Sequence, residues 1–267
     1  MIHRAKTRIG LIGFGFIGAQ VFRRLRDQPQ LAIEVAFVHN RDRARLAEVP
    51  SAMILDDLTG MPERSCDLVV EMAHPDYTRR FGEAILAHAD YLPLSVTALA
   101  DQALFDRLTK QANQSGKRLL IPHGALMGTD NLVESRHAWS EVEITFYKNP
   151  ANIDFSESGY DPTQIKGETV VYDGPARAIA ALYPRNVNTM VTCALATIGL
   201  DRCRARLIAV PAARVAMIEV RATGHDGSLL HMRKEQPMSG VSGTEMFDSQ
   251  FGSIMRAAGV RQSPGFV

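Results

Sequence analysis

The sequence predicts an α/β domain with a doubly wound parallel sheet, followed by a second domain of the α+β type. Up to about residue 121, short apolar strand candidates alternate with amphipathic helix candidates. This alternation is typical of right-handed crossovers between parallel strands, with helices covering both faces of the sheet. Beyond residue 124 the alternation ends, because strand candidates follow one another and two helix candidates are adjacent. That change predicts a second domain of a different class.

Hydrophobic periodicity and turn residues define the expected elements of the first domain. Pro50 stops one helix, Asp101 is a suitable N-cap for another, and Gly116 closes that helix. In chain order, the sequence predicts strands at 8–12, 33–38, 67–72, 92–96 and 118–121, alternating with helices at 19–25, 41–49, 77–89 and 101–114.

The second domain is expected to be richer in strands. His225-Asp226-Gly227 has the turn chemistry of a hairpin between two of them. We expect strands at 142–147, 166–173, 205–210, 215–222 and 228–234, helices at 175–182 and 188–198, and a last helix at 244–258. The predicted domains are a doubly wound domain at 1–123 and an α+β domain of the substrate-binding type at 124–243, with segment 244–267 packing back on the first.

Composition excludes several classes of function. The chain has 267 residues, 46% of them hydrophobic and 22% charged, with a formal net charge of +1. This balance gives no basic surface for nucleic acid, and no apolar run reaches the roughly 20 residues of a membrane span. The scattered Cys66, Cys193 and Cys203 form no metal-binding or disulfide pattern and favour a cytoplasmic compartment. The sequence predicts no metal and a small-molecule substrate.

A glycine-rich turn follows the first strand and opens a helix. Gly13, Gly15 and Gly18 have the spacing of the Rossmann dinucleotide-binding fingerprint. Such glycines allow a tight turn, a close approach of the backbone to pyrophosphate, and close packing of helix on strand. The helix start at Phe16 and Ile17 would offer its N–H groups to the phosphates. The alternative is a plain strand–turn–helix in which the glycines serve packing alone.

The ends of the next two strands supply further candidate cofactor contacts. An acidic residue normally ends the second strand and holds the ribose of NAD, but here Asn40 and Arg41 stand there, with Asp42 one step later. Because a guanidinium can pair with a 2′-phosphate, the cofactor is predicted as NADP or NAD; alternatively, Arg41 is simply solvated. Ala73 and His74 follow the third strand and could contact the cofactor, or His74 could serve the turn at Pro75.

Several stretches together resemble the L-aspartate dehydrogenase family. They are VVEMAHP at 69–75, LSVTALAD at 94–101, GALMGTD at 124–130, GETVVYDGPARAIAALYPRNVN at 167–188 and GLDR at 199–202. The resemblance implies a Rossmann domain and an α+β domain that supplies the dimer contact and half of the active site. It also implies NAD(P)-dependent oxidation of L-aspartate to iminosuccinate, which hydrolyses to oxaloacetate and ammonia, by a homodimer.

The resemblance also implies roles for residues in the second half. It places 124–128 along the nicotinamide pocket, so that Ala125 and Asn188 would contact the cofactor, while Asn186 lies beside it as a candidate substrate contact. Lys148 matches a family lysine that could meet a substrate carboxylate. The alternatives are helix capping for the two asparagines, because asparagine caps helices well, and a solvated position for the lysine.

The chain departs from the family pattern on the substrate side. The Asn-x-His of the family falls on Ala216 and Ile218, and of the Asn-Pro-Lys-Thr-Ser element at 241–245 only Thr244 is kept, as a candidate substrate contact. Amine oxidation needs a base, and His123 is the leading substitute, although it could be structural. The losses leave two other hypotheses open: a reductase of a non-acidic imine, carbonyl or aldehyde, or a cofactor-binding protein without catalysis.

Overall fold

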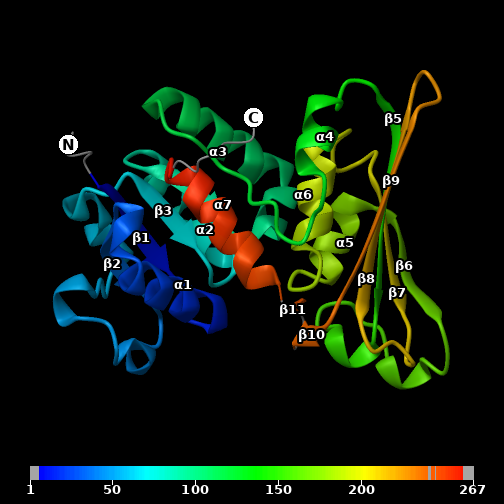
Figure 1. Cartoon of the computed structure of the whole chain (residues 1–267), viewed down its shortest axis with the longest axis horizontal. Helices are drawn as coiled ribbons and strands as arrows, with labels where there is room; N and C mark the ends of the chain where they lie inside the picture. Colours follow the sequence, from blue (N-terminus) through cyan, green and yellow to red (C-terminus); the bar gives the residue numbers. More distant parts are fainter. Residues whose placement is uncertain (1–5, 240–241, 244, 261–267) are drawn as a thin grey trace. The chain divides into compact units, whose positions relative to one another are not determined.

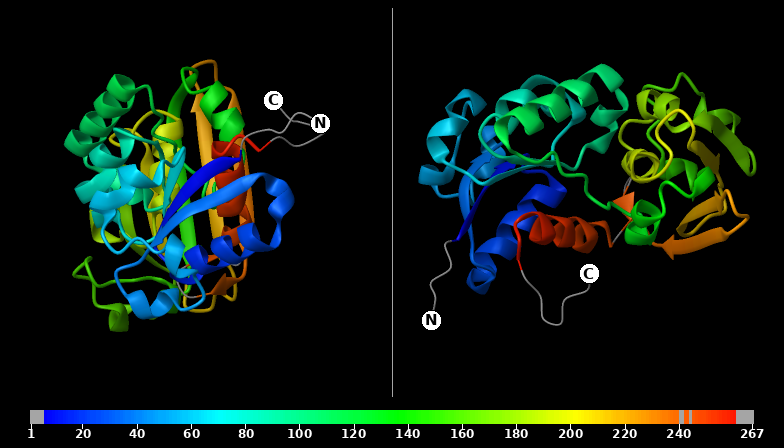
Figure 2. Two further views of the ribbon diagram at one scale, coloured as in Figure 1. Left: turned by 90° about the vertical axis from the view of Figure 1, so that its left-hand side faces the viewer. Right: turned by 90° about the horizontal axis from the view of Figure 1, so that it is seen from above.

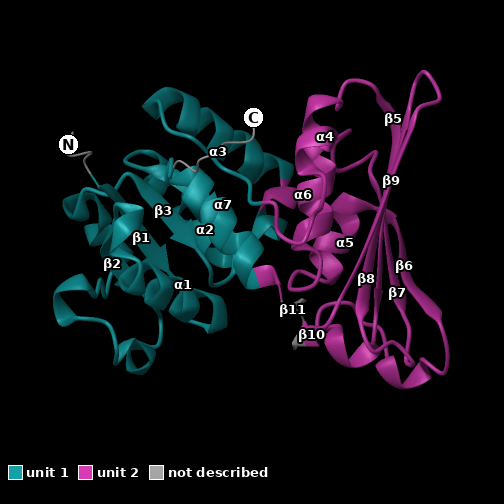
Figure 3. Cartoon of the chain, in the orientation of Figure 1, with its two compact units in different colours: residues 1–98, 102–122, 247–267 teal, residues 99–101, 123–246 magenta. Residues whose placement is uncertain are grey.

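The computed structural model describes residues 6–239, 242–243 and 245–260. Within that part the chain forms two compact units, which are coloured separately in Figure 3. Unit 1 comprises residues 6–98, 102–122 and 247–260, and unit 2 comprises 99–101, 123–239, 242–243 and 245–246. The chain therefore leaves unit 1 after Pro122 and returns to it with its last helix.

Unit 1 contains the predicted parallel sheet, which confirms the fold class of the first domain. Its four strands run in the order β2-β1-β3-β4, and all three pairings are parallel. Every residue of β3 is buried, as expected for a strand with a helix layer on each face. The bounds of the strands are β1 (Thr7–Ile12), β2 (Ile33–His39), β3 (Leu68–Glu71) and β4 (Asp90–Pro93).

Four helices cover the two faces of this sheet (Figures 1 and 2). Helices α1 (Phe16–Asp27) and α7 (Met246–Ala257) lie on one face, and α2 (Pro75–Leu86) and α3 (Gln102–Ser115) lie on the other. The apolar stripes of α1 and α7 share one core cluster with strand residues such as Leu11. Burial of that stripe holds the C-terminal helix on the first sheet.

Three elements of unit 1 differ from the prediction. The strand expected at 92–96 is β4 at Asp90–Pro93, because the chain leaves the sheet after Pro93 and enters the 3-10 helix η5 (Val96–Ala100). The helix expected at 41–49 is only a 3-10 turn, η2 (Arg43–Leu46). The Asp42 side chain caps this turn, and Pro50 follows after only seven residues, so the segment has room for about two helical turns. The strand expected at 118–121 is reduced to one bridge between Tyr91 and Leu119. Pro122 follows at once, and proline has no N–H to extend a ladder.

Unit 2 is built on a five-stranded mixed sheet in the order β6-β7-β5-β8-β9. Only the β5–β7 pair is parallel. A short pair, β10 (Met238–Ser239) and β11 (Ser242–Gly243), follows the sheet. The other strands are β5 (Trp139–Lys148), β6 (Thr169–Pro175), β7 (Arg204–Ala209), β8 (Ala216–Gly224) and β9 (Leu229–Gln236).

The helices of unit 2 lie on one face of its sheet (Figures 1 and 2). They are α4 (Thr129–Glu134), which the sequence did not predict, α5 (Ala176–Leu182) and α6 (Asn188–Ala196). Strand β5 shows the alternation that this layering requires, since Val142, Ile144 and Phe146 are buried beneath the helices. We call this side of the sheet the inner face.

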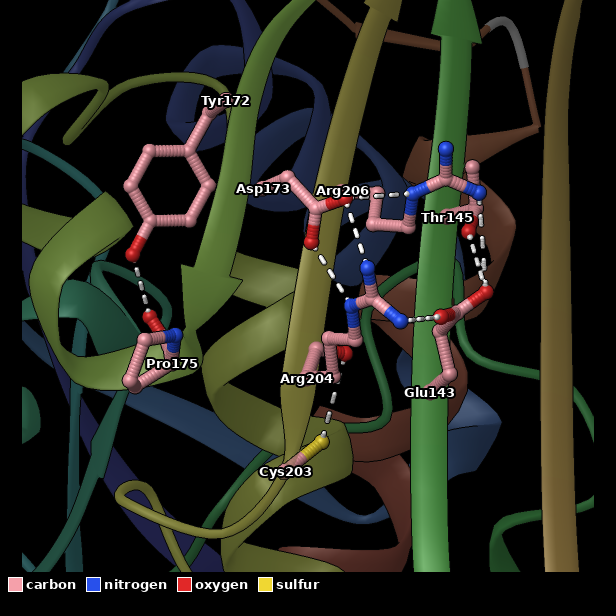
Figure 4. Close-up of polar contacts among 8 residues, drawn as sticks. All are labelled: Glu143, Thr145, Tyr172, Asp173, Pro175, Cys203, Arg204 and Arg206. Atoms are coloured by element: carbon pink, nitrogen blue, oxygen red, sulfur yellow. Dashed lines mark hydrogen bonds and ion pairs between the residues drawn. The ribbon is translucent and has the colours of Figure 1, made fainter.

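The outer face of the same sheet carries a network of charges (Figure 4). Arg204 and Arg206 both reach the Asp173 carboxylate, at 2.7 and 3.2 Å. On β5, Glu143 approaches the same two guanidinium groups at 3.4 and 3.8 Å. Thr145 is only 2% exposed beside them, so this polar layer covers the backbone of β5.

Candidate functional site

The glycine turn between β1 and α1 combines packing with open space. Gly13 has φ +99°, and a Cβ there would lie 2.8 Å from the Met72 backbone. A Cβ on Gly18 would lie 2.1 Å from the carbonyl oxygen of Gly13. By contrast, a Cβ on Gly15 would meet no atom within 4 Å. The outer two glycines are thus required by packing, whereas Gly15 faces space that a pyrophosphate could fill.

The amino end of α1 suits an anion. Its N-cap is Gly15, which has no side chain to accept the first N–H groups, and its first turn contains no acidic residue. Phe16, the first helical residue, is 72% exposed, while Ile17 is half-buried. Uncapped N–H groups and the positive end of the helix dipole attract phosphate. The residues present therefore fit the dinucleotide that the spacing predicted.

The carboxyl end of β2 shows how its polar residues are used. Asn40 shapes the turn, since its Oδ1 accepts from the Phe14 N–H at 2.9 Å and its Nδ2 donates to the Asp42 carbonyl at 2.8 Å. The Asp42 carboxylate accepts from the Ala44 N–H at 3.1 Å and caps η2. Arg41 is exposed and has no hydrogen bond or ion pair with another described residue. The Arg41 side chain is therefore free to meet a ligand, whereas the Asp42 carboxylate is already hydrogen-bonded.

Glu71, at the end of β3, is the most buried carboxylate among the described residues, and the sequence did not identify it as a site residue. It is fully buried and accepts hydrogen bonds from the N–H groups of Ala73 and His74, at 2.6 and 2.8 Å. It also accepts from the hydroxyl and the N–H of Ser95, at 3.0 and 3.2 Å. Burial raises the pKa of Glu71 to about 7 despite these hydrogen bonds. One carboxylate thus fixes the loops after β3 and β4, at the edge where parallel sheets bind ligands.

His74 has a structural task at this edge. It is the N-cap of α2, and its Nδ1 accepts from the Asp76 N–H at 3.2 Å. The turn role considered for this histidine is therefore present. Both Ala73 and His74 are exposed, and their contact with a cofactor stays a prediction.

In unit 2, the loop 123–128 is held from two sides. The Thr189 hydroxyl at the start of α6 accepts from the Ala125 N–H at 3.2 Å, and a Cβ on Gly124 would lie 3.0 Å from it. On the other side, Lys234 Nζ on β9 donates to the Ala125 carbonyl at 3.4 Å. The loop is therefore hydrogen-bonded both to the start of α6 and to the edge strand β9.

Three of the predicted residues lie around this loop and α6. His123 is half-buried, and its carbonyl accepts from the Leu126 N–H at 3.1 Å. Asn188 is the first residue of α6, but Val187 occupies the N-cap position, so capping of α6 explains neither asparagine. Asn186 is buried, and its amide holds the segment 152–154 through bonds to Asp154 N and Asn152 O, at 2.8 and 3.0 Å.

Lys148 ends β5 on the inner face of the sheet. Its side chain is buried, so the solvated alternative is wrong. Its Nζ lies 5.3 Å from the centroid of the Phe146 ring. Burial lowers the pKa of Lys148 to about 8. Because an ammonium in an apolar setting is stabilised by an anion, this position suits a carboxylate ligand.

The inner face also carries two polar residues that the sequence did not identify, Lys234 and Gln236. The positions where a family Asn and His are expected, Ala216 and Ile218, are both buried and apolar. Cross-strand pairing places Gln236 opposite Ala216 and Lys234 opposite Ile218. Among the described residues, none gives a hydrogen bond to the buried Oε1 of Gln236. Thr244 lies outside the described residues.

No helix in the described ranges has the length and apolar character to cross a membrane. No group of three or more His, Cys, Asp and Glu residues in those ranges is arranged to hold a metal ion. The candidate site residues therefore fall into a phosphate-binding set in unit 1 and a lysine-containing set in unit 2.

Comparisons with protein families and curated proteins cover both sets. Residues 130–244 match the family model described as aspartate dehydrogenase, C-terminal, and residues 13–122 match the NAD-binding domain of homoserine dehydrogenase. The L-aspartate dehydrogenase of Brucella anthropi is 35% identical, with 85% of this chain and 86% of that protein covered. An aspartate dehydrogenase domain-containing protein of Xenopus tropicalis is 33% identical, with 97% of each chain covered.

Solved structures share the fold. The aspartate dehydrogenase of Thermotoga maritima superposes with a TM-score of 0.76 at 23% identity, over 99% of this chain and all of that one. An engineered D-amino acid dehydrogenase bound to NADP⁺ gives a TM-score of 0.51 at 15% identity, covering 95% of this chain and 89% of that one. At these identities the likeness concerns the fold: a Rossmann-type unit followed by a mixed-sheet unit.

Proposed function

The chain belongs to the aspartate dehydrogenase family, and from this premise we propose that it oxidises L-aspartate to iminosuccinate, with NADP or NAD as electron acceptor. As a member it is an NAD(P)-dependent dehydrogenase. The observation that carries the choice of substrate is similarity to L-aspartate dehydrogenases at about 35% identity over most of the chain, together with a buried cation, Lys148, on the inner face.

The phosphate-binding set would hold the cofactor. The open space at Gly15 and the uncapped start of α1 would receive the pyrophosphate, and Arg41 would meet the adenosine ribose or its phosphate. When bound, the cofactor supplies the hydride acceptor for the carbon that bears the amine. Glu71 would keep the loops at the strand ends in place around it.

The lysine-containing set would orient the substrate. The Ala125 region and Asn188 would take the nicotinamide end, and the ammonium of Lys148 would pair with a substrate carboxylate. With a pKa of about 8, Lys148 is mostly protonated at pH 7 and so carries the charge this pairing needs. Pairing inside a water-poor site is stronger than in solvent. The rigid Asn186–Asp154 contact would preserve the shape of this region.

Amine oxidation also requires removal of a proton from the substrate ammonium before hydride can leave the adjacent carbon. His123 is the group that the sequence offers for this step. Because the base must be unprotonated to act, the rate of oxidation is expected to rise with pH up to the pKa of that group.

Steady-state assays test the proposal. Reduced cofactor is followed at 340 nm with L-aspartate, L-glutamate, L-alanine and D-aspartate, each with NADP and with NAD. We expect L-aspartate to give the highest kcat/KM, and Lys148→Met to raise the KM for aspartate at least tenfold while leaving NADP binding within about twofold. The exposed Lys166→Met variant is the matched control. No turnover of L-aspartate with either cofactor would contradict the proposal.

A second function has its own supporting observation. Ala216 and Ile218 make the inner face of β8 apolar where the family pattern is polar. Such a lining favours an uncharged imine, carbonyl or aldehyde that is reduced at the expense of NADPH. Consumption of NADPH with non-acidic compounds, and none with oxaloacetate plus ammonia, would favour this reductase over the aspartate dehydrogenase.

A further inference from the structure

Lys234 occupies an unusual position on the edge strand β9. The register pairs it directly with Ile218 on β8, which in turn pairs with Phe146 on β5. Directly paired residues of antiparallel strands point to the same face, about 5 Å apart at Cβ. The side chain of Lys234 thus starts from the inner face, beside the position where the family pattern has its histidine.

The side chain of Lys234 is directed at the loop 123–128. Its Nζ donates to the Ala125 carbonyl at 3.4 Å, and the side chain is 19% exposed. The same ammonium forms an ion pair with the half-exposed Glu245, which precedes α7. It therefore joins the loop proposed to receive the nicotinamide to a carboxylate that can stabilise its charged form.

We infer that Lys234 is the general base that accepts the proton of the substrate ammonium, in place of the missing histidine. The inference rests on the proposed function. In the step, the neutral Nζ takes one proton from the substrate –NH₃⁺ and becomes –NH₃⁺, leaving a neutral substrate amine. The lone pair of the substrate amine then forms the C=N bond as hydride leaves the adjacent carbon for NADP⁺ or NAD⁺. The products are the iminium, the reduced cofactor and a protonated lysine.

Glu245 acts as a positioning residue for this base. Its carboxylate fixes the Nζ and stabilises the ammonium formed after proton transfer. Partial burial acts in the opposite direction and lowers the pKa of Lys234, which favours the neutral form required before the reaction.

The surrounding charges support a division of labour between two lysines. Among the described titratable groups, Glu245 pairs with Lys234 itself, His123 belongs to the loop that Lys234 contacts, and Lys148 ends β5 beside Phe146. The charged neighbours of Lys234 along β8 and β9, which are Glu219, Arg233 and Glu235, alternate onto the outer face. Lys148 remains the cation that binds a carboxylate, while Lys234, which contacts the loop itself, moves the proton.

The test replaces the lysine and follows the pH dependence of catalysis. For Lys234→Met, we expect kcat with L-aspartate to fall at least 100-fold, with the KM for aspartate and the Kd of NADPH within about threefold of the wild type. The rising limb of the pH profile should disappear, and ethylamine in the buffer should restore part of the rate. Lys234→Arg keeps the charge but cannot deprotonate, so it should be folded and equally inactive. Lys166→Met controls for loss of a lysine elsewhere in unit 2.

Two further variants make the test specific to proton transfer. Ile218→His combined with Lys234→Met places an imidazole at the paired position and should restore activity, with a pH limb near 6.5. Glu245→Gln removes the carboxylate that stabilises the ammonium form of Lys234. In this single variant, the rising limb of the pH–rate profile should therefore move to lower pH. A purely structural role of Lys234 would produce neither the rescue nor the shift.

The outcomes separate this inference from the proposed function. If Lys234→Met keeps the wild-type kcat and pH profile, or if His123→Gln removes the limb instead, Lys234 is not the base, although the enzyme still oxidises aspartate. If the wild type turns over no L-aspartate, the proposed function fails and the inference fails with it. Circular dichroism and NADPH binding show that each variant is folded.

Discussion

At the scale of single residues, the end of β2 predicts a preference for NADP. Asp42, the carboxylate that could hold a ribose hydroxyl, is bonded to the Ala44 N–H and to Arg45, at 3.1 and 3.5 Å. Arg41 is exposed and makes no hydrogen bond or ion pair with another described residue, so binding a phosphate would break no existing contact. A free guanidinium next to an occupied carboxylate favours the 2′-phosphate of NADP over the hydroxyl of NAD.

Removing this guanidinium should therefore weaken only one of the two cofactors. We expect Arg41→Ala to raise the KM for NADP at least tenfold, since a charge-assisted contact with phosphate contributes on the order of 1.5–3 kcal/mol, and to leave the KM for NAD within twofold. Initial rates at saturating substrate measure both values. Arg43→Ala, which removes an arginine paired with Asp56, is the matched control. Equal loss with NAD and NADP would show that Arg41 does not read the phosphate.

Single residues also show how far sequence reasoning reaches. Gly13, Gly15 and Gly18 could be recognised because their spacing is local. Glu71 could not, because its importance comes from burial and from bonds to Ser95 on another loop. Lys234 had a usable signal: a hairpin centred on Asp226 pairs the residues eight before and eight after it, Ile218 and Lys234.

At the scale of elements, most helices and strands were predicted to within a few residues, and the failures are short segments. Strand β9 and helix α7 lie within two residues of their expected bounds at each end. The helix expected at 41–49 failed because Pro50 ends the segment about two turns after Asp42, although Leu46 and Val49 pack on the core. Helix α4 was missed because its six residues contain too few turns to show a period. Positions of elements thus follow from periodicity, whereas the contacts between loops do not.

Glu71 links the carboxyl ends of two strands, and its ionisation should make stability depend on pH. Its pKa is about 7 in the folded protein against 4.5 for the free group, so the folded state binds more protons between these values. Stability contributed by this group is therefore present below about pH 4.5 and is lost as pH rises through 7. The difference amounts to about 3 kcal/mol.

The Glu71→Gln variant should lack this dependence. Glutamine can keep the bonds to Ala73, His74 and the Ser95 hydroxyl through one oxygen, but its amide nitrogen would face the Ser95 N–H. We expect the stability of the variant, relative to the wild type, to increase by about 3 kcal/mol between pH 4.5 and 8. Urea unfolding across that range measures it, with the exposed Glu83→Gln as control. A constant difference between wild type and variant across the range would show that Glu71 does not titrate there.

At the scale of the whole molecule, the sheet of unit 2 has two unlike faces. The inner face is covered by α4, α5 and α6, while the outer face carries the Glu143–Arg204–Arg206–Asp173 network (Figure 4). Antiparallel and mixed sheets tolerate one polar face in water, so this pattern is stable in a single chain. The outer face also carries charges of both signs. In a two-fold arrangement, the positive groups of one chain could pair with the negative groups of a second chain.

We expect the protein to be a homodimer, as the resemblance to its family implied, with this outer face as the contact. Because a two-fold interface uses the same patch twice, Arg206→Glu would introduce two reversed charges beside Asp173 and Glu143 and should dissociate the dimer. Light scattering after gel filtration should give twice the mass of one chain for the wild type and a single-chain mass for the variant. Arg79→Glu, on helix α2 of unit 1, should remain dimeric. A wild type of single-chain mass would refute the dimer, and a dimeric Arg206→Glu would place the contact on another surface.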